Sequence, residues 1–181
     1  MSENVIETAR VEGARARMLF LAEFEDSPGA YAIPLVLRVV DGRVDVEVFA
    51  AALRDVVGRH VSLRTAFDKT GDGWVENVRD AEEAPVLDRS AHEWDGRLPL
   101  APDPRCEVPT AAAVYARHVV IVVHHVAADG QSMPTILDDL EHAYRERLAG
   151  RAPRWPEPPA YTSEPPSASA EGLAPLFAGV P

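Results

Sequence analysis

The sequence has little cysteine, no long apolar run and no excess of positive charge. Cys106 is the single cysteine among 181 residues, so no disulfide can form within the chain. No apolar run approaches the ~18–20 residues that a membrane-spanning helix needs. The first ten residues, MSENVIETAR, are polar and acidic and lack the apolar core of a secretory signal. These absences predict a cytoplasmic chain in a reducing compartment.

The charge balance limits the partners of the chain. Asp and Glu number 29 against 18 Lys and Arg, which gives a formal net charge of −11. A surface of that sign repels the phosphates of nucleic acids and of anionic membranes, so we expect neither as a partner. The length suits one domain with its own hydrophobic core.

Hydrophobic periodicity divides the chain into strands and helices. Residues 34–40 are rich in β-branched side chains and lead into an Asp-Gly turn, which predicts a strand. Residues 45–59 combine a capping aspartate with apolar positions at helical spacing. Residues 110–115 and 118–125 predict two strands with a tight connection, and residues 132–148 predict an amphipathic helix.

The two ends of the chain differ in composition from its middle. Residues 1–13 are polar and acidic and predict a flexible leader. Residues 156–181 are rich in Pro, Ser and Ala and predict a linker or tail. We therefore expect the folded unit to span residues 14–155.

Residues 124–130 carry the clearest chemical signature, of the form HHxxxDG. The expected strand delivers a histidine to the point where the chain leaves the sheet. Asp129 can fix that turn through a salt bridge, and Gly130 lets the backbone bend closely before a helix. A histidine held there can take or steer a proton from a bound nucleophile.

Two other interpretations of the histidines stay open. A histidine at a strand end is most often a structural residue satisfied by the backbone. His124, His125 and Asp129 could instead bind a metal ion. Adjacent strand residues point to opposite faces, however, which disfavours one ion shared by both histidines. We expect no metal.

Two further segments accompany this signature. Residues 59–67, RHVSLRTAF, match the pattern RHxxLRTxF at every fixed position. Residues 14–21, ARARMLFL, are similar to AQxRLWFL, with Arg15 in place of glutamine and Leu19 in place of tryptophan. With HHxxxDG, these segments resemble the motifs of condensation domains of nonribosomal peptide synthetases, and the resemblance covers about residues 14–155.

The resemblance implies an α/β fold of the chloramphenicol-acetyltransferase-like superfamily. Such a lobe is a two-layer α+β sandwich with a mixed, largely antiparallel sheet and flanking helices. A complete condensation domain has two such lobes, and this chain is similar to the N-terminal one. Residues 161–164, YTSE, depart from the family's Tyr-x-Asp-Tyr continuation.

The resemblance also implies roles for individual residues. His125 faces the active centre as the catalytic residue, whereas His124 points away and supports the site. Asp129 has an architectural role, and we expect it to be buried beside a guanidinium. Arg64 is the first choice for that partner and Arg17 the second.

The implied activity is that of an acyltransferase that forms peptide bonds. An amine held on one carrier protein attacks the thioester of an acyl group held on another. The phosphopantetheine arms belong to the carrier proteins, so we expect this chain to bind no cofactor. We expect it to be inactive without a second lobe, supplied in cis or in trans. The alternatives are a non-catalytic docking module for carrier proteins or tailoring enzymes, and a self-associating enzyme with sites between subunits.

Overall fold

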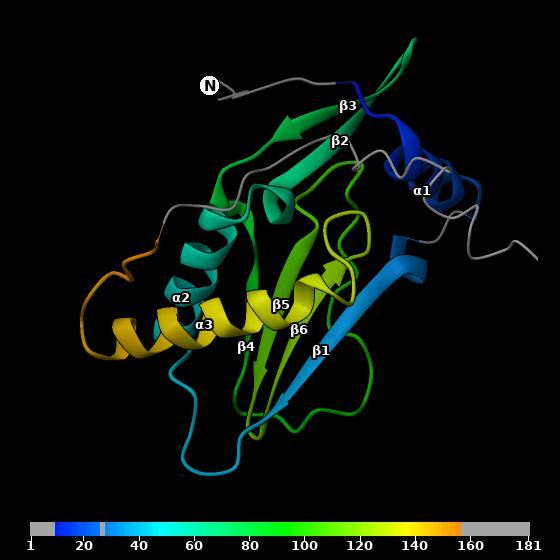
Figure 1. Ribbon diagram of the computed structural model, residues 1–181. Helices are drawn as coiled ribbons and strands as arrows, with labels where there is room; N and C mark the ends of the chain where they lie inside the picture. The colour runs from blue at the N-terminus through cyan, green and yellow to red at the C-terminus, as the bar shows by residue number, and fades with distance from the viewer. Residues whose placement is uncertain (1–9, 26–27, 157–181) are drawn as a thin grey trace, which may run out of the picture.

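The computed structural model describes residues 10–25 and 28–156. Its α-helices are α1 (Gly13–Phe24), α2 (Val46–Arg59) and α3 (Ser132–Leu148) (Figure 1). Its strands are β1 (Ala32–Arg38), β2 (Thr65–Thr70), β3 (Gly73–Val78), β4 (Val86–Arg89), β5 (Thr110–Tyr115) and β6 (His118–His124). Short 3-10 helices span Pro28–Tyr31, Val61–Arg64 and Ala81–Glu83.

Four strands form one sheet in the order β1-β6-β5-β4, and β2 and β3 form a separate hairpin. Strand β6 runs antiparallel to both β1 and β5, while β4 runs parallel to β5. The predicted mixed, largely antiparallel sheet is therefore confirmed. Because β6 lies in the interior and all but its first residue is buried, its apolar run is unbroken rather than alternating.

Helices α2 and α3 pack on one another and cover one face of the sheet (Figure 1). Asp45 caps α2, because its Oδ1 accepts hydrogen bonds from the N–H groups of Glu47 (3.0 Å) and Val48 (3.1 Å). The apolar stripe of each helix meets alternate residues of β5 and β6. The main core includes Leu53, Val56, Val57, Ala112, Val114, Ile121, Val123, Ile136 and Leu140.

A second, smaller core joins α1 to the β2–β3 hairpin. Leu19, which stands where the family has tryptophan, is fully buried there with Phe67. Arg15, which stands where the family has glutamine, forms an ion pair of 2.9 Å with the buried Glu76 of β3. Of the two departures from the first motif, Leu19 therefore contributes to the core and Arg15 contributes an ion pair.

Most of the expected leader and tail lies outside the described residues. The end of the leader differs from the prediction, because Val11 is buried and its N–H donates to the Trp74 carbonyl at 3.0 Å. Arg10 forms a bridge with Val75 beside it. Of the expected tail, only Pro156 is described. Within the described ranges, each helix is too short or too polar to cross a bilayer.

Candidate functional site

The histidine pair lies where β6 ends. His124 is the last residue of β6 and pairs with Ala32 at the start of β1. The His124 N–H donates to the Pro109 carbonyl, and the His125 N–H donates to the Tyr31 carbonyl, both at 2.8 Å. Successive peptide groups of a strand point in opposite directions, so these two bonds hold the chain from both sides. They fix its direction as it leaves the sheet.

The His124 side chain is fully buried, and one of its two ring nitrogens has a hydrogen-bond partner. Its Nδ1 accepts from the Val126 N–H at 3.1 Å, and its carbonyl accepts from the Ala127 N–H at 2.9 Å. A ring nitrogen that accepts carries no proton, so the neutral ring is protonated at Nε2. Burial lowers the pKa of His124 to about 4, against the opposing field of Asp103. His124 is therefore neutral at physiological pH.

His125 has the opposite environment. Its side chain is exposed, whereas that of His124 is buried. His125 is the first residue of the turn that follows β6, and its N–H is still held by the Tyr31 carbonyl beside β1. The His125 ring can therefore be reached by a second molecule or domain.

The prediction for Asp129 was wrong. The residue is exposed, and its Oδ1 accepts from the Ser132 hydroxyl (2.7 Å), the Ser132 N–H (2.9 Å) and the Gln131 N–H (3.0 Å). The hydrogen bond from the Ser132 hydroxyl contributes most to lowering the pKa of this carboxyl. Asp129 therefore closes the turn that leads into α3 and forms no buried ion pair.

Neither predicted guanidinium binds Asp129. Arg64 Nη1 donates to the Arg79 carbonyl at 2.7 Å, which ties the second motif to the end of β3. Arg17 is exposed on α1. Asp129 needs no arginine partner, because a carboxylate just before a helix can accept hydrogen bonds from the free N–H groups at the helix start.

Asp129→Ala should therefore have a small effect on stability. We expect a loss of about 1 kcal/mol in the free energy of unfolding, typical of a lost side-chain hydrogen bond. A buried ion pair would instead cost ~3–5 kcal/mol. Because the pKa of Asp129 is lowered in the folded state, its contribution is present above the unfolded pKa. The difference between wild type and variant should thus vanish as the pH falls through the folded pKa. Urea unfolding at pH 7 and over a series of acidic pH values checks both points, and a loss above ~3 kcal/mol at pH 7 would restore the buried-pair hypothesis.

Gly130 also differs from its prediction. A Cβ built at this position meets no atom within 4 Å among the described residues, so close approach of this chain's own backbone does not require glycine. As far as the described part of the chain goes, the space beside Gly130 is open, next to the turn that carries His125.

A small pocket lies beside the histidine turn, against the second motif. Its volume is about 220 Å³, and its lining consists of His60, Ser62, Ala127, Ala128, Ser132, Thr135 and Ile136. His60 Nε2 lies 2.7 Å from Asp139 Oδ2, which also accepts from Arg59 Nε at 2.9 Å. The second motif thus braces α3 through Asp139, a residue that the sequence patterns did not single out.

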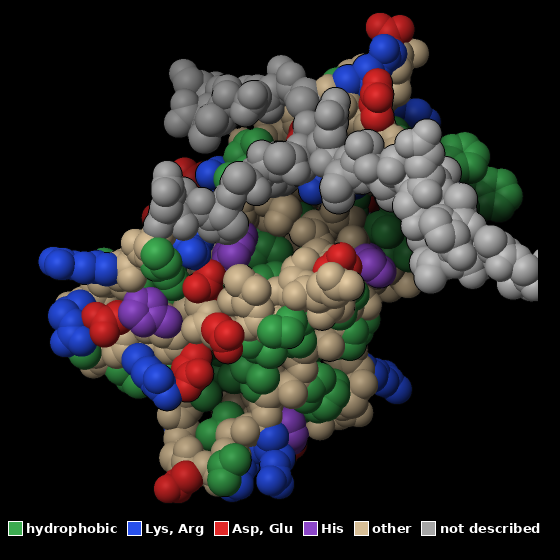
Figure 2. All heavy atoms as spheres, viewed as in Figure 1, with side chains coloured by type: hydrophobic (Ala, Val, Ile, Leu, Met, Phe, Trp, Pro, Cys, Tyr) green, Lys and Arg blue, Asp and Glu red, His purple; other side chains and the backbone are tan. Residues whose placement is uncertain are grey.

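A larger hollow of about 510 Å³ lies away from the histidines. It includes Leu37 and Arg38 of β1 with Leu137, Leu140 and Tyr144 of α3. Arg38 pairs with His118 at the start of β6, so six residues of strand, about 20 Å, separate it from His124. Figure 2 shows hydrophobic side chains gathered on the lower part of this face, below α3. The hollow belongs to the opposite end of the sheet.

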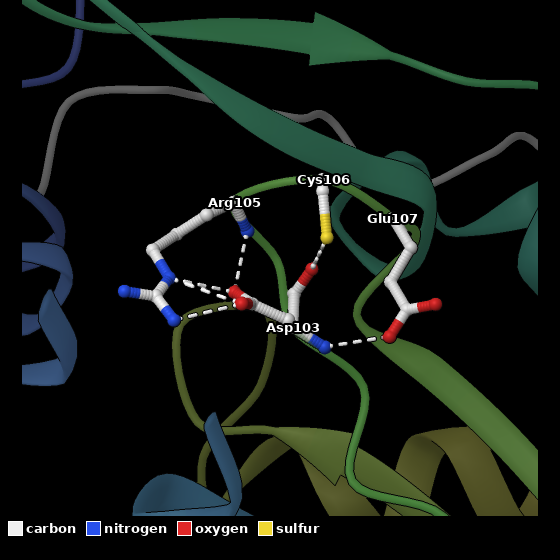
Figure 3. A network of polar contacts seen from close by, with 4 residues as sticks. All are labelled: Asp103, Arg105, Cys106 and Glu107. Carbon is white, nitrogen blue, oxygen red and sulfur yellow. Dashed lines mark hydrogen bonds and ion pairs between the residues drawn. The ribbon is translucent and has the colours of Figure 1, made fainter. Parts of the chain in front are cut away.

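The described residues also limit metal chemistry and reveal charges that the sequence analysis missed. Within residues 10–25 and 28–156, no three His, Cys, Asp or Glu side chains are grouped to hold a metal ion. Although Cys106 is exposed, partial desolvation of its thiol and the nearby Asp103 charge raise the thiol pKa, which disfavours a reactive thiolate (Figure 3). Asp103 and Arg105 act electrostatically on His124 from the loop before β5. That loop has no periodic pattern, so its partners could not be identified from the sequence.

Comparisons with known proteins place this geometry in a family, although no family model matches the chain. The chain is 37% identical over 157 residues to the "Probable non-canonical nonribosomal peptide synthetase (NRPS) CymA" of Salinispora arenicola. It is 36% identical over 159 residues to the isonitrile lipopeptide synthase of Mycobacterium tuberculosis. These matches cover 81% and 78% of this chain but only 2% and 6% of those proteins.

Solved structures show the same relationship. The X-domain in its complex with OxyB from teicoplanin biosynthesis matches 83% of this chain, with 30% identity and a TM-score of 0.72. The epimerization domain of tyrocidine synthetase B (18% identity, TM-score 0.67) and the starter condensation domain of rhizomide synthetase RzmA (23%, 0.63) share the fold. The chain spans 35%, 39% and 40% of these three solved chains. It belongs to the condensation-domain family of nonribosomal peptide synthetases and corresponds to one part of such a domain.

Proposed function

We propose that this chain is the N-terminal lobe of a peptide-bond-forming condensation domain and that His125 is its catalytic residue. The observation that carries the proposal is the contrast within the histidine pair. His124 is buried, neutral and hydrogen-bonded, whereas His125 is exposed on a backbone held from both sides. A rigid strand end that presents one accessible imidazole is suited to proton transfer.

In the proposed reaction, the amine of a carrier-bound aminoacyl group attacks the thioester of a carrier-bound acyl group. The His125 imidazole accepts or orients the proton of that amine, and a carrier thiol leaves. The substrates are held on the phosphopantetheine arms of partner carrier proteins, so the chain needs no cofactor of its own. Asp129 already occupies the N–H groups of Gln131 and Ser132. An oxyanion would therefore need other donors.

The test uses a completed domain. Residues 10–156 replace the corresponding part of a related condensation domain, and two loaded carrier proteins supply the substrates. Amide product on the acceptor carrier protein is measured by mass spectrometry. We expect His125→Ala to lower the rate by about 10²–10⁴, the usual contribution of general acid–base catalysis. His92→Ala, at an exposed histidine outside the site, is the matched control and should leave the rate unchanged. Full activity of His125→Ala would remove the catalytic assignment.

A docking module is the second candidate, and the likeness to the X-domain favours it. That domain was solved in a complex with OxyB, and its match is 30% identical with a TM-score of 0.72. Under this candidate the fold is retained as a surface for carrier proteins or a tailoring enzyme. A completed domain that binds such proteins, yet forms no amide with or without His125, would favour docking over catalysis.

A further inference from the structure

Strand β1 forms the longer of the two free edges of the four-stranded sheet. The strand order β1-β6-β5-β4 leaves β1 and β4 with one neighbour each among the described residues. Strand β4 has only four residues and ends in two exposed charges, Asp88 and Arg89, whereas β1 has seven residues. A long edge strand carries a row of unpaired peptide groups and can pair with a strand of another chain. The β1 edge is therefore the side at which a second chain could extend this sheet.

The backbone bonds between β1 and β6 determine which peptide groups of β1 face outward. The His125 N–H donates to the Tyr31 carbonyl at 2.8 Å, and the Val39 N–H donates to the Arg117 carbonyl at 2.9 Å. Both bonds continue the register in which Ala32 pairs with His124. Antiparallel partners exchange hydrogen bonds at every second position, so the odd-numbered residues of β1 bond to β6. The even-numbered residues turn their peptide groups to the free edge, and these are Ala32, Pro34, Val36 and Arg38.

Pro34 occupies one of these outward positions. It has no N–H, and its ring fills the space into which an N–H would point. The next outward residue, Val36, is 42% exposed. The outward N–H groups of Ala32, Val36 and Arg38 have no hydrogen-bond acceptor in the part of the chain that the structure describes. The β1 edge thus offers a surface for strand pairing that is interrupted at Pro34.

A second copy of the chain could pair with β1 in an antiparallel arrangement about a twofold axis. In the register of full overlap, Ala32 lies opposite Arg38 of the copy, and Pro34 lies opposite Val36 of the copy. Pro34 then gives the Val36 carbonyl no donor, and symmetry repeats the loss, so the dimer lacks two hydrogen bonds. A register shifted far enough to leave Pro34 unpaired can place Arg38 opposite Arg38 of the copy. Like charges directly opposite one another are destabilising.

We propose that the β1 edge is a latent pairing site for a second copy of this chain and that Pro34 and Arg38 keep it closed. Pro34 blocks the register of full overlap, and Arg38 blocks the shifted one. The inference goes beyond the function proposed above and does not rest on it. It removes the β1 edge as a route to sites formed between copies of this chain.

The experiment measures dimerisation of the 181-residue chain by sedimentation equilibrium. Wild type should be monomeric at ~100 μM, with a dimer Kd above about 1 mM. Pro34→Val restores the N–H and adds a side chain that strands favour. It should tighten the dimer by about ten- to a hundredfold, because two hydrogen bonds are gained in each dimer. Pro134→Val, at an exposed proline of α3, is the matched control and should stay monomeric.

Amide hydrogen exchange identifies the surface that forms the dimer. In wild type, the odd-numbered amides of residues 33–37 should be protected, because they bond to β6. The amides of Ala32 and Val36 should exchange quickly, because they face the free edge. In the dimer of Pro34→Val, the Ala32 and Val36 amides should become protected by about tenfold or more. The odd-numbered amides should be protected in both proteins.

Arg38→Val tests the shifted register. By itself the substitution permits only a short overlap, so it should tighten the dimer less than Pro34→Val does. Combined with Pro34→Val, it should give a tighter dimer than Pro34→Val alone, since both registers are then open. If Pro34→Val fails to fold, Pro34→Thr restores the N–H with a polar residue that strands also favour, and it gives the same comparison.

Three results would overturn the inference. The first is a monomeric state of both Pro34→Val and Pro34→Thr under the conditions in which wild type is monomeric. The second is protection of the Val36 amide in wild type equal to that of its odd-numbered neighbours, because Val36 would then not face a free edge. The third is a dimer whose newly protected amides lie outside β1. None of these measurements involves amide formation, so failure of the proposed function and failure of this inference are distinguishable.

Discussion

Assayed by itself with two loaded carrier proteins, the 181-residue chain should form no amide product above the uncatalysed background. His125 is exposed, and the described residues leave the space beside Gly130 open. Water therefore competes for the thioester, and the amine is not aligned with it. Alignment of two well-oriented partners contributes up to ~7–11 kcal/mol to such a reaction. Its loss corresponds to about five to eight powers of ten in rate.

Supplying the remaining part of a condensation domain should restore the product. The experiment has two arms. In one the second lobe is fused to this chain, and in the other it is expressed separately and added. Intact-protein mass spectrometry of the acceptor carrier protein measures the amide product in both arms. The control is the second lobe assayed with the two loaded carrier proteins in the absence of this chain. Comparable turnover by the chain alone and by the completed domain would contradict the dependence on a second lobe. It would instead favour sites formed between copies of this chain.

Asp139→Ala should be strongly destabilising. Asp139 Oδ2 accepts from both Arg59 Nε (2.9 Å) and His60 Nε2 (2.7 Å), and these two side chains are only 9% and 12% exposed. The substitution leaves one nearly buried cation and one imidazole without their acceptor. We expect a loss of about 2–4 kcal/mol in the free energy of unfolding. For a chain of this size, that corresponds to a fall of roughly 4–16 °C in the melting temperature.

The neighbouring Asp138 provides a matched control for this effect. It lies on the same helix but is exposed, so Asp138→Ala should change the stability by less than about 0.5 kcal/mol. Calorimetry on both variants and wild type gives the comparison. Equal melting temperatures for Asp139→Ala and Asp138→Ala would show that the contact with Arg59 and His60 contributes nothing to stability.

The sequence was sufficient to predict the helices and strands in which apolar residues recur with a clear period. The helix expected over residues 45–59 became α2 (Val46–Arg59), with Asp45 as its cap. The helix expected over 132–148 was confirmed at both ends. The apolar run of β6 predicted a buried strand, and the structure places it inside the sheet. These signals are local, because each depends on residues within one or two turns or one strand.

The contacts around the site were less predictable. The resemblance to the family predicted an ion pair between Asp129 and Arg64. In the structure, Asp129 instead accepts hydrogen bonds at the start of α3, and Arg64 donates to the Arg79 carbonyl. A pattern states which residue types occur, but not which of several nearby donors a carboxylate meets. Asp103 was missed for the same reason. Its effect on His124 depends on a loop whose position is set by bonds to β2 and β6.

The pairing of β1 with β6 also determines the order in which the chain can fold. Ala32 pairs with His124 and Arg38 with His118, so the two partners are 92 and 80 residues apart in sequence. Closing so long a loop costs entropy before any pairing is gained, which makes this step slow compared with the formation of α2 or of the β2–β3 hairpin. During synthesis at ~5–20 residues per second, β1 leaves the ribosome ~4–18 s before its partner does. In that interval its apolar residues have no strand to pair with, and the newly made chain is exposed to aggregation until β6 is complete.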